Sequence, residues 1–326
     1  MEETIFKKAL DLYGISEQQL IRQLSGGTYN TVVEFEQGGD LFVIRVGALE
    51  FDTEATNGVI EWLQFLQTNG AAVPILVRSK NNNLVEYIQT DDRIFSVDVT
   101  HKISGENART HIIENQDLSW ARAFGQAVGK IHQVTKVNAP ESVSLVRPHW
   151  NQIGSDFNPP IQLSPDEIGM KRRNVEILNQ IKDLPKMPDV YGLVHGDLHL
   201  GNILIQSGST AISILDFDDV AFGWYMMDLV APITDLWVCY SGENKVEIVN
   251  SYLVEVLRGY QLETQLSSEQ LAQIPLLLDL LEIGLYTRFH QMKALQQENG
   301  WVKTFMTGRK ERIEAGIPFV ELQMAD

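Results

Sequence analysis

Residues 193–219 read LVHGDLHLGNILIQSGSTAISILDFDD, and this stretch decides the fold. Short apolar segments flank the polar residues Asp197 and Asn202, and a further apolar segment, Ile212–Leu215, leads directly into Asp216. Short apolar runs separated by polar and glycine-containing loops predict a strand–loop–strand unit. We expect the loop and the strand end to bring Asp197, Asn202 and Asp216 within reach of one another.

These side chains are the set that phosphoryl transfer requires. One carboxylate orients the attacking hydroxyl and accepts its proton, while an amide oxygen and a second carboxylate hold Mg²⁺ on the nucleotide phosphates. Protein kinases space the catalytic Asp and the Mg²⁺-binding Asn as D-x-x-x-x-N. Asp197 and Asn202 have this spacing. The pattern therefore favours phosphoryl transfer with ATP and Mg²⁺.

The composition is that of a globular protein. The chain has 326 residues, of which 44% are hydrophobic and 21% are charged, enough for one large domain or two lobes sharing a cleft. The longest apolar runs are interrupted by polar residues, and the first residues, MEETIFKKAL, lack the apolar core of a signal peptide. Cys239 is the only cysteine and cannot form an intrachain disulfide. We expect a cytoplasmic protein.

The charge of the chain limits its partners. The formal net charge of −17 repels nucleic-acid phosphates and anionic lipids, so we expect neither nucleic acid nor a membrane as a partner. An acidic surface favours a cationic substrate, although solubility alone also explains the charge. The expected partner is a small molecule with a hydroxyl group that accepts phosphate, and the chain is expected to be a monomer or homodimer.

The remaining sequence predicts an α+β fold with two lobes, a small strand-rich lobe over residues 1–104 and a larger, mainly helical lobe over 105–326. The apolar periodicity changes from mixed to helical after Gly105. The main predicted elements are a helix over Glu2–Tyr13, strands over Thr31–Phe35, Leu41–Val46 and Ile94–Ile103, and helices over Thr53–Thr68 and Asp117–His132. The strands at Thr31–Phe35 and Leu41–Val46 are joined by a Gly38-Gly39 turn, and the chain is helical from about Trp224.

HGDLHLGNIL, the later ILDFDD and the MMDL of Met226–Leu229 together resemble the aminoglycoside phosphotransferase and choline kinase-like family, which has a protein kinase-like fold. The likeness extends to the first lobe. Leu24–Asn30 (LSGGTYN) resembles the family's phosphate-facing loop, and Phe42–Val46 (FVIRV) resembles its strand with a basic residue. The resemblance covers residues 20–320 or so.

The resemblance implies roles for residues of the larger lobe. Asp197 resembles the catalytic base, and Asn202 and Asp216 resemble the Mg²⁺ ligands. The residues with supporting roles would be His195, His199, Asp218 and Asp228. Of these, Asp218 would reach the metal through water, and Asp228 would be a buried acid that braces the loop.

In the smaller lobe the resemblance implies a nucleotide site. Arg45 stands where a protein kinase has Lys and would bind phosphate, with Glu54 as its expected partner and Glu61 as the rival. The other expected nucleotide contacts are Ser25, Gly26, Gly27 and Thr28 at the phosphates, and Thr100, Lys102 and Ile103 at the adenine.

The implied activity is transfer of the γ-phosphate of ATP to a hydroxyl of an aminoglycoside, amino alcohol, homoserine or sugar. The alternatives are a protein Ser/Thr kinase of the same fold, a nucleotide-binding pseudokinase favoured by Arg45, and a metal-dependent phosphoesterase. The phosphoesterase would use His195, Asp197, His199 and Asp216 as ligands. No segment of the sequence identifies the acceptor or decides between ATP and GTP.

Overall fold

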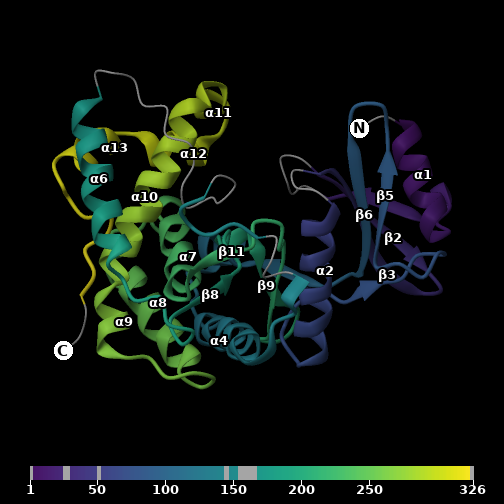
Figure 1. The fold of residues 1–326 in the computed structure, drawn as a ribbon, viewed down its shortest axis with the longest axis horizontal. Coiled ribbons are helices and arrows are strands. Elements are labelled where there is room, and N and C mark those ends of the chain that lie inside the picture. Colours follow the sequence, from purple (N-terminus) through teal and green to yellow (C-terminus); the bar gives the residue numbers. More distant parts are fainter. Residues whose placement is uncertain (1–2, 25–29, 50–52, 143–146, 153–166, 324–326) are drawn as a thin grey trace. The chain divides into compact units, whose positions relative to one another are not determined.

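The computed structural model describes residues 3–24, 30–49, 53–142, 147–152 and 167–323. The chain divides into an N-terminal unit, residues 1–104 with 139–146, and a C-terminal unit, residues 105–138 with 147–326. The larger β-sheet belongs to the N-terminal unit, and most of the helices belong to the C-terminal unit (Figure 1).

The N-terminal unit is an antiparallel sheet with two long helices, and the secondary structure starts with helix α1 (Glu3–Tyr13). The other elements of this unit are the 3₁₀ turn η1 (Glu17–Gln19), β1 (Leu20–Gln23), β2 (Asn30–Gln37), β3 (Asp40–Ala48), α2 (Thr53–Thr68), β4 (Leu76–Val77), β5 (Val85–Gln89) and β6 (Ile94–His101). The strand order is β1-β2-β3-β6-β4, and β5 also pairs with β6. Gly38 and Gly39 have φ values of +66° and +91°, which confirms the predicted two-residue hairpin turn.

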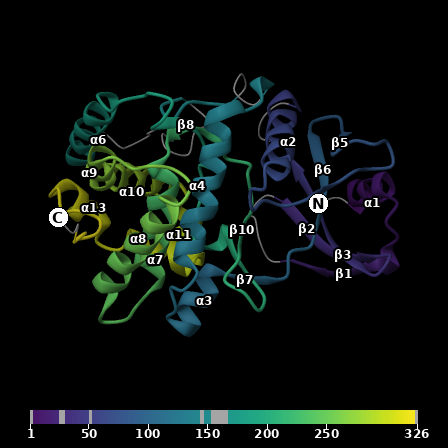
Figure 2. The same cartoon turned by 90° about the horizontal axis from the view of Figure 1, so that it is seen from below.

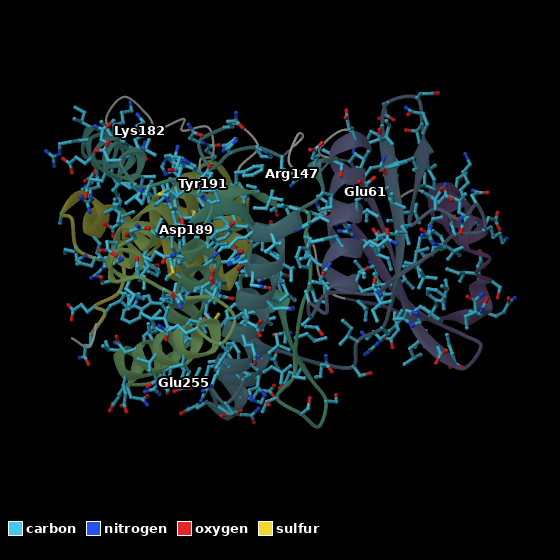
Figure 3. The ribbon with its side chains drawn as sticks, turned by 60° about the horizontal axis from the view of Figure 1, so that its bottom comes forward. Glu61, Arg147, Lys182, Asp189, Tyr191 and Glu255 are labelled. Carbon is cyan, nitrogen blue, oxygen red and sulfur yellow. The ribbon has the colours of Figure 1, made fainter. Side chains whose placement is uncertain are left out.

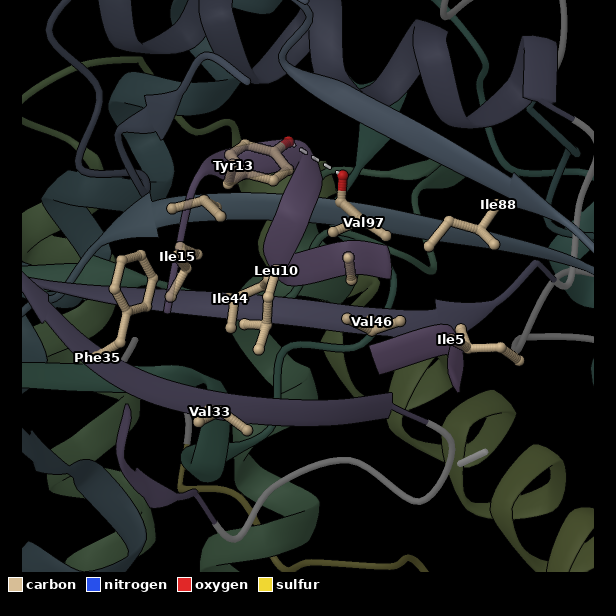
Figure 4. Packing of buried hydrophobic residues seen from close by; sticks show 12 residues of the cluster. Ile5, Leu10, Tyr13, Ile15, Val33, Phe35, Ile44, Val46, Ile88 and Val97 are labelled. Atoms are coloured by element: carbon tan, nitrogen blue, oxygen red, sulfur yellow. Dashed lines mark hydrogen bonds between the residues drawn. The ribbon is translucent and has the colours of Figure 1, made fainter. Parts of the chain in front are cut away.

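The sheet of the N-terminal unit lies between α1 and α2 (Figures 1 and 2). The helix α1 buries Leu10 and Tyr13 against the inward-facing residues Val33, Ile44 and Val97 of the sheet (Figure 4). The Tyr13 hydroxyl also donates a hydrogen bond of 3.1 Å to the Val97 carbonyl, which gives the buried phenol a polar partner. The alternating apolar residues of the strands thus form a core of their own under α1.

The C-terminal unit is mainly helical, with two small antiparallel sheets, β10-β9-β7 and β11-β8. Its elements are β7 (Gly105–Asn107), α3 (Ala108–Asn115), α4 (Ala121–Asn138), α6 (Ile168–Lys182), β8 (Tyr191–Val194), η2 (Leu200–Asn202), β9 (Ile203–Gln206), β10 (Ile212–Ile214), β11 (Ala221–Trp224), α7 (Met226–Cys239), α8 (Lys245–Tyr260), α9 (Ser268–Ala272), α10 (Ile274–Gln291), α11 (Lys293–Glu298), α12 (Gly300–Met306) and α13 (Arg309–Glu314). This helical content confirms the prediction that the C-terminal region is mainly helical.

The predicted helix over Asp117–His132 is displaced in the structure, where α4 begins at Ala121 and continues to Asn138. Asp117 instead forms a turn before the helix, because its carboxylate accepts the Ser119 amide at 2.9 Å and its carbonyl accepts the Trp120 indole at 3.0 Å. Within the described ranges of the chain, no helix combines the length and the apolar character that crossing a bilayer demands.

Close packing of α4 against α8 depends on glycines. A Cβ placed on Gly125 of α4 would lie 2.0 Å from the Val256 carbonyl oxygen, and one on Gly259 of α8 would lie 1.9 Å from the Arg122 carbonyl oxygen. These distances are shorter than any real carbon–oxygen contact, and the obstructing atoms are backbone. The two helices can therefore approach this closely only with glycine at both positions.

We predict that Gly125→Ala lowers the free energy of unfolding by about 1–3 kcal/mol or more, because α4 and α8 must separate to admit the methyl group. Gly300→Ala is the matched control, since no atom lies within 4 Å of the Cβ position at the start of α12. Denaturant unfolding of both variants measures the difference. Equal stability of Gly125→Ala and Gly300→Ala would contradict the packing argument.

Candidate active site

Asn202 and Asp216 are brought to the same end of a hairpin. Strands β9 and β10 pair antiparallel with Ile203 opposite Ile214, and the Leu215 amide donates to the Asn202 carbonyl at 2.9 Å. Asn202 precedes the first strand and Asp216 follows the second, so both lie where the hairpin opens. The predicted meeting of the loop and the strand end is therefore present in the structure.

The backbone of Asp216 is in an unusual conformation. Its φ of +63° lies in the left-handed region, which a non-glycine residue occupies at a cost of about 1–3 kcal/mol. The Asp216 side chain is exposed. Strain of this kind concentrates where a side chain must point in a functional direction.

Asp197 is held by its own loop. The Asn202 side-chain amide donates to the Asp197 carbonyl at 2.9 Å, and the Asp197 amide donates to His195 Nδ1 at 3.3 Å. His195 Nε2 donates in turn to the Leu215 carbonyl at 2.8 Å. Burial lowers the pKa of His195, which keeps the ring neutral and leaves one nitrogen to accept and one to donate. His195 thus ties the loop to the end of β10.

Asp228 lies in the first turn of α7, and its buried carboxylate accepts hydrogen bonds from the start of the loop. Its Oδ2 accepts the His195 amide at 2.8 Å, and its Oδ1 accepts the Gly196 amide at 3.2 Å. A third donor is His132 of α4, whose Nε2 lies 2.9 Å from Oδ2. His132 Nδ1 accepts the Tyr260 hydroxyl at 3.0 Å, so a chain of hydrogen bonds extends from α8 to the loop.

His199 lies beside Asp197. Its Nδ1 accepts the Gly201 amide at 3.0 Å, and its Nε2 lies 3.7 Å from Asp197 Oδ2. Burial lowers the pKa of His199 to about 4, so the imidazole is neutral at pH 7 with its proton on the nitrogen that faces Asp197. This placement agrees with a supporting role for His199.

Sequence reasoning missed three bracing residues. Asp235 of α7 accepts the Leu200 amide at 3.0 Å and is paired with Arg109. Arg147, labelled in Figure 3, donates Nε to the Val220 carbonyl at 2.6 Å and Nη2 to the Asp218 carbonyl, which fixes the segment after Asp216. The seven-residue separation of Asp228 and Asp235, two helical turns, was a usable signal. Arg147 stands in an irregular stretch without any such signal.

In the N-terminal unit, Arg45 forms an ion pair with Asp98. The two residues are opposite each other on β3 and β6, and Arg45 Nε donates to Asp98 Oδ2 at 3.0 Å. Glu54 and Glu61 are at exposed positions of α2, and Glu61 (labelled in Figure 3) accepts the Ser142 hydroxyl at 2.5 Å. A pairing of Arg45 with Glu54 or Glu61 stays a prediction.

The predicted adenine contacts lie at the end of β6. Thr100 is paired within the sheet, and the Lys102 amide donates to the Leu41 carbonyl at 2.9 Å. The Lys102 ammonium lies 3.7 Å from a Glu34 carboxylate oxygen. Backbone hydrogen bonding thus occupies the amide of Lys102, and contacts of Thr100, Lys102 and Ile103 with adenine stay a prediction. The predicted phosphate contacts Ser25, Gly26, Gly27 and Thr28 lie outside the described residues.

The side-chain oxygens at the open end of the hairpin are of the kind that Mg²⁺ binds. Because the Asn202 amide nitrogen donates to Asp197, the amide oxygen is directed away as an acceptor. An amide oxygen and the carboxylate of Asp216 are the hard oxygen ligands that Mg²⁺ prefers. His195, by contrast, uses both ring nitrogens in hydrogen bonds and cannot be a ligand of the phosphoesterase site considered above.

Comparison with known proteins gives the family. Residues 20–268 match the phosphotransferase enzyme family. The amicoumacin kinase of Bacillus subtilis (strain 168) is 26% identical over 325 residues, which cover 97% of this chain and 93% of that protein.

Two solved structures extend the likeness to the fold. The amicoumacin kinase hAmiN, in complex with AMP-PNP, Ca²⁺ and Ami, superposes with a TM-score of 0.86 at 25% identity, covering 99% of this chain and 96% of that one. A microcompartment-associated aminopropanol kinase superposes with a TM-score of 0.73 at 18% identity, covering 97% and 99% of the two chains. These likenesses confirm the predicted kinase-like fold.

Fold and site define a phosphotransferase that acts on small molecules. The chain belongs to the phosphotransferase enzyme family. The resemblance inferred from HGDLHLGN, ILDFDD and MMDL is therefore confirmed. The expectation of ATP and a divalent metal agrees with the AMP-PNP and Ca²⁺ of the hAmiN complex.

We predict that His132 makes the stability of the protein fall in acid. Burial lowers the pKa of His132 below its ordinary value of 6.5, so the unfolded chain takes up a proton that the folded chain refuses. Stability is therefore unaffected above about pH 6.5 and is lost by up to about 1.4 kcal/mol per pH unit below it.

His132→Gln can keep a donor for Asp228 and an acceptor for Tyr260 without titrating. Its free energy of unfolding, measured by urea titration across this pH range, should decline less steeply than that of the wild type. Parallel declines would show that His132 is not the source.

Proposed function

We propose that this protein is an ATP- and Mg²⁺-dependent kinase that transfers the γ-phosphate of ATP to a hydroxyl of an amine-bearing small molecule. The observation that carries the proposal is the braced loop in which Asp197, Asn202 and the strand end at Asp216 are joined by hydrogen bonds. These residues are the catalytic Asp and metal-binding set of kinase chemistry.

Asp197 would act as the base. Its carboxylate orients the acceptor hydroxyl and takes its proton as the oxygen bonds to the γ-phosphorus and the bond from that phosphorus to the ADP oxygen breaks. The products are the phosphate ester and ADP. The neutral His199, whose Nε2 lies 3.7 Å from Asp197 Oδ2, would help to orient the carboxylate for the proton transfer.

Asn202 and Asp216 would hold Mg²⁺, which when bound neutralises the negative charge of the nucleotide phosphates. We assign nucleotide binding to the N-terminal unit. There Arg45, held by Asp98, is a guanidinium able to bind phosphate oxygens bidentately. The backbone of Ile103 would contact the adenine.

An amine-bearing acceptor is supported by two observations. The relatives described above are, by their names, two amicoumacin kinases and an aminopropanol kinase, and the last of these acts on an amino alcohol. The net charge of −17 favours a cationic ligand through long-range attraction. Together these observations favour an amine-bearing acceptor over a neutral sugar.

The test is a coupled assay of ADP formation with ATP and Mg²⁺ across amicoumacin, aminopropanol, other amino alcohols, aminoglycosides, homoserine and neutral sugars, with the product identified by the mass of one added phosphoryl group. We expect turnover with an amine-bearing acceptor. Phosphorylation of neutral sugars alone would reject the proposed acceptor class.

Asp197→Asn is the matched test of the base, since it keeps the size of the side chain and removes its charge. We expect kcat to fall by at least about 10²-fold, because general-base assistance is worth roughly 10²–10⁴. The thermal unfolding midpoint should stay close to that of the wild type. Full turnover by Asp197→Asn would refute the role of Asp197 while leaving the acceptor result standing.

A further inference from the structure

A second buried carboxylate lies on the same face of α7 as Asp228. Asp235 follows Asp228 by two helical turns, and only 1% of its surface is exposed. Asp228 accepts the amides of His195 and Gly196, whereas Asp235 Oδ2 accepts the amide of Leu200 at 3.0 Å. The loop that carries Asp197 is thus held by α7 on both sides of that residue.

Both carboxylate oxygens of Asp235 accept hydrogen bonds from more than one donor. Arg109 of α3 donates Nε at 3.0 Å and Nη2 at 2.7 Å to the Oδ2 that also accepts Leu200. Oδ1 accepts the Trp301 indole of α12 at 2.7 Å and the Cys239 thiol at 3.1 Å. A buried charge is tolerated only with such pairing. Asp235 therefore connects the loop, α3, α7 and α12 at one point.

Arg109 extends this connection to the reacting groups. A Cβ on Gly201 would lie 2.8 Å from His199 Cε1 and 3.8 Å from Arg109 Cζ, so the guanidinium lies against the loop beside His199. Burial alone would lower the pKa of Arg109, but the negative charges of Asp235 and Asp197 raise it. The Arg109 side chain is 37% exposed, which leaves the cation close to the surface of the site.

We propose that Asp235 is a positioning residue for phosphoryl transfer, which holds the backbone of residues 199–202 so that Asp197 and Asn202 keep their separation. The proposal rests on the proposed function, in which Asp197 is the base and Asn202 is a metal ligand. Asp235 touches no substrate and acts through the Leu200 amide and Arg109.

The first test is Asp235→Asn. An amide has one accepting oxygen, so its NH₂ group must face either the Leu200 amide or the Trp301 and Cys239 donors. We expect kcat to fall by about 10²-fold, because small displacements of catalytic groups have costs of this size. The KM for ATP should change less than kcat, since Asp235 would reach the nucleotide only through Asn202 and Mg²⁺ and the direct nucleotide contacts are assigned to the N-terminal unit.

Glu86→Gln is the matched control. Glu86 is a buried carboxylate of β5 that also organises a turn, accepting the Ser79 hydroxyl and the side-chain amides of Asn81 and Asn83. If Asp235 serves only stability, both variants lower the unfolding midpoint and both keep kcat. A fall of kcat in Asp235→Asn alone supports positioning, whereas equal kcat in both overturns it.

Hydrogen exchange gives a readout that needs no substrate. The amide of Leu200 should exchange faster in Asp235→Asn than in the wild type, and at the wild-type rate in Glu86→Gln. Unchanged exchange at Leu200 together with wild-type kcat in Asp235→Asn would overturn the proposal. Loss of the proposed function is seen separately, as a wild type that phosphorylates no acceptor or an Asp197→Asn that keeps full turnover.

Arg109→Gln is the second variant, because the glutamine amide can still donate one hydrogen bond to the buried Asp235 while the positive charge and the second hydrogen bond of Arg109 are lost. We expect Arg109→Gln to lower kcat and to speed exchange at Leu200. Arg109→Lys, which keeps the charge without the pair of hydrogen bonds that converge on Asp235 Oδ2, should recover part of kcat. Full kcat in Arg109→Gln with wild-type exchange at Leu200 would overturn the proposal.

Discussion

The candidate site depends on one buried carboxylate, that of Asp228, which accepts hydrogen bonds from two consecutive backbone amides of the loop. Asp228 receives the amides of His195 and Gly196 and is itself oriented by His132, which Tyr260 orients in turn. An unpaired buried carboxylate would cost several kcal/mol, so this set of donors must be kept together. The direction of the chain as it enters the Asp197 loop is fixed by α7, α4 and α8 rather than by the loop.

Buried groups also hold the backbone at other positions of the loop. His195 is buried and neutral, so it can accept from Asp197 and donate to the end of β10 at once. Arg147 holds the carbonyls that follow Asp216. Asp197 is partly exposed and Asp216 is exposed, while the backbone beside each of them is tied to buried groups. Pre-organisation of this kind orients the backbone that carries Asp197 and Asp216.

Much of the fold was predictable because its signals are local. Gly38 and Gly39 predicted a hairpin turn, and Thr53–Thr68 matches α2 at both ends. The proximity of Asn202 and Asp216 was predictable because they flank one short hairpin, in which sequence order dictates proximity. The start of α4 was predicted wrongly because side-chain bonds of Asp117 form a turn where the periodicity alone favours helix.

The sequence by itself determined the class of chemistry and the expected reacting residues, since these are carried by side-chain types at fixed short separations. Only the tertiary structure decided which residues hold them. Arg109 and Asp235 are 126 positions apart, and His132 and Asp228 are 96 apart, yet each pair shares a hydrogen bond. The pairing of Arg45 with Asp98 likewise follows from the register of β3 and β6. Burial and strand register arise from the packed chain as a whole, and no local pattern encodes them.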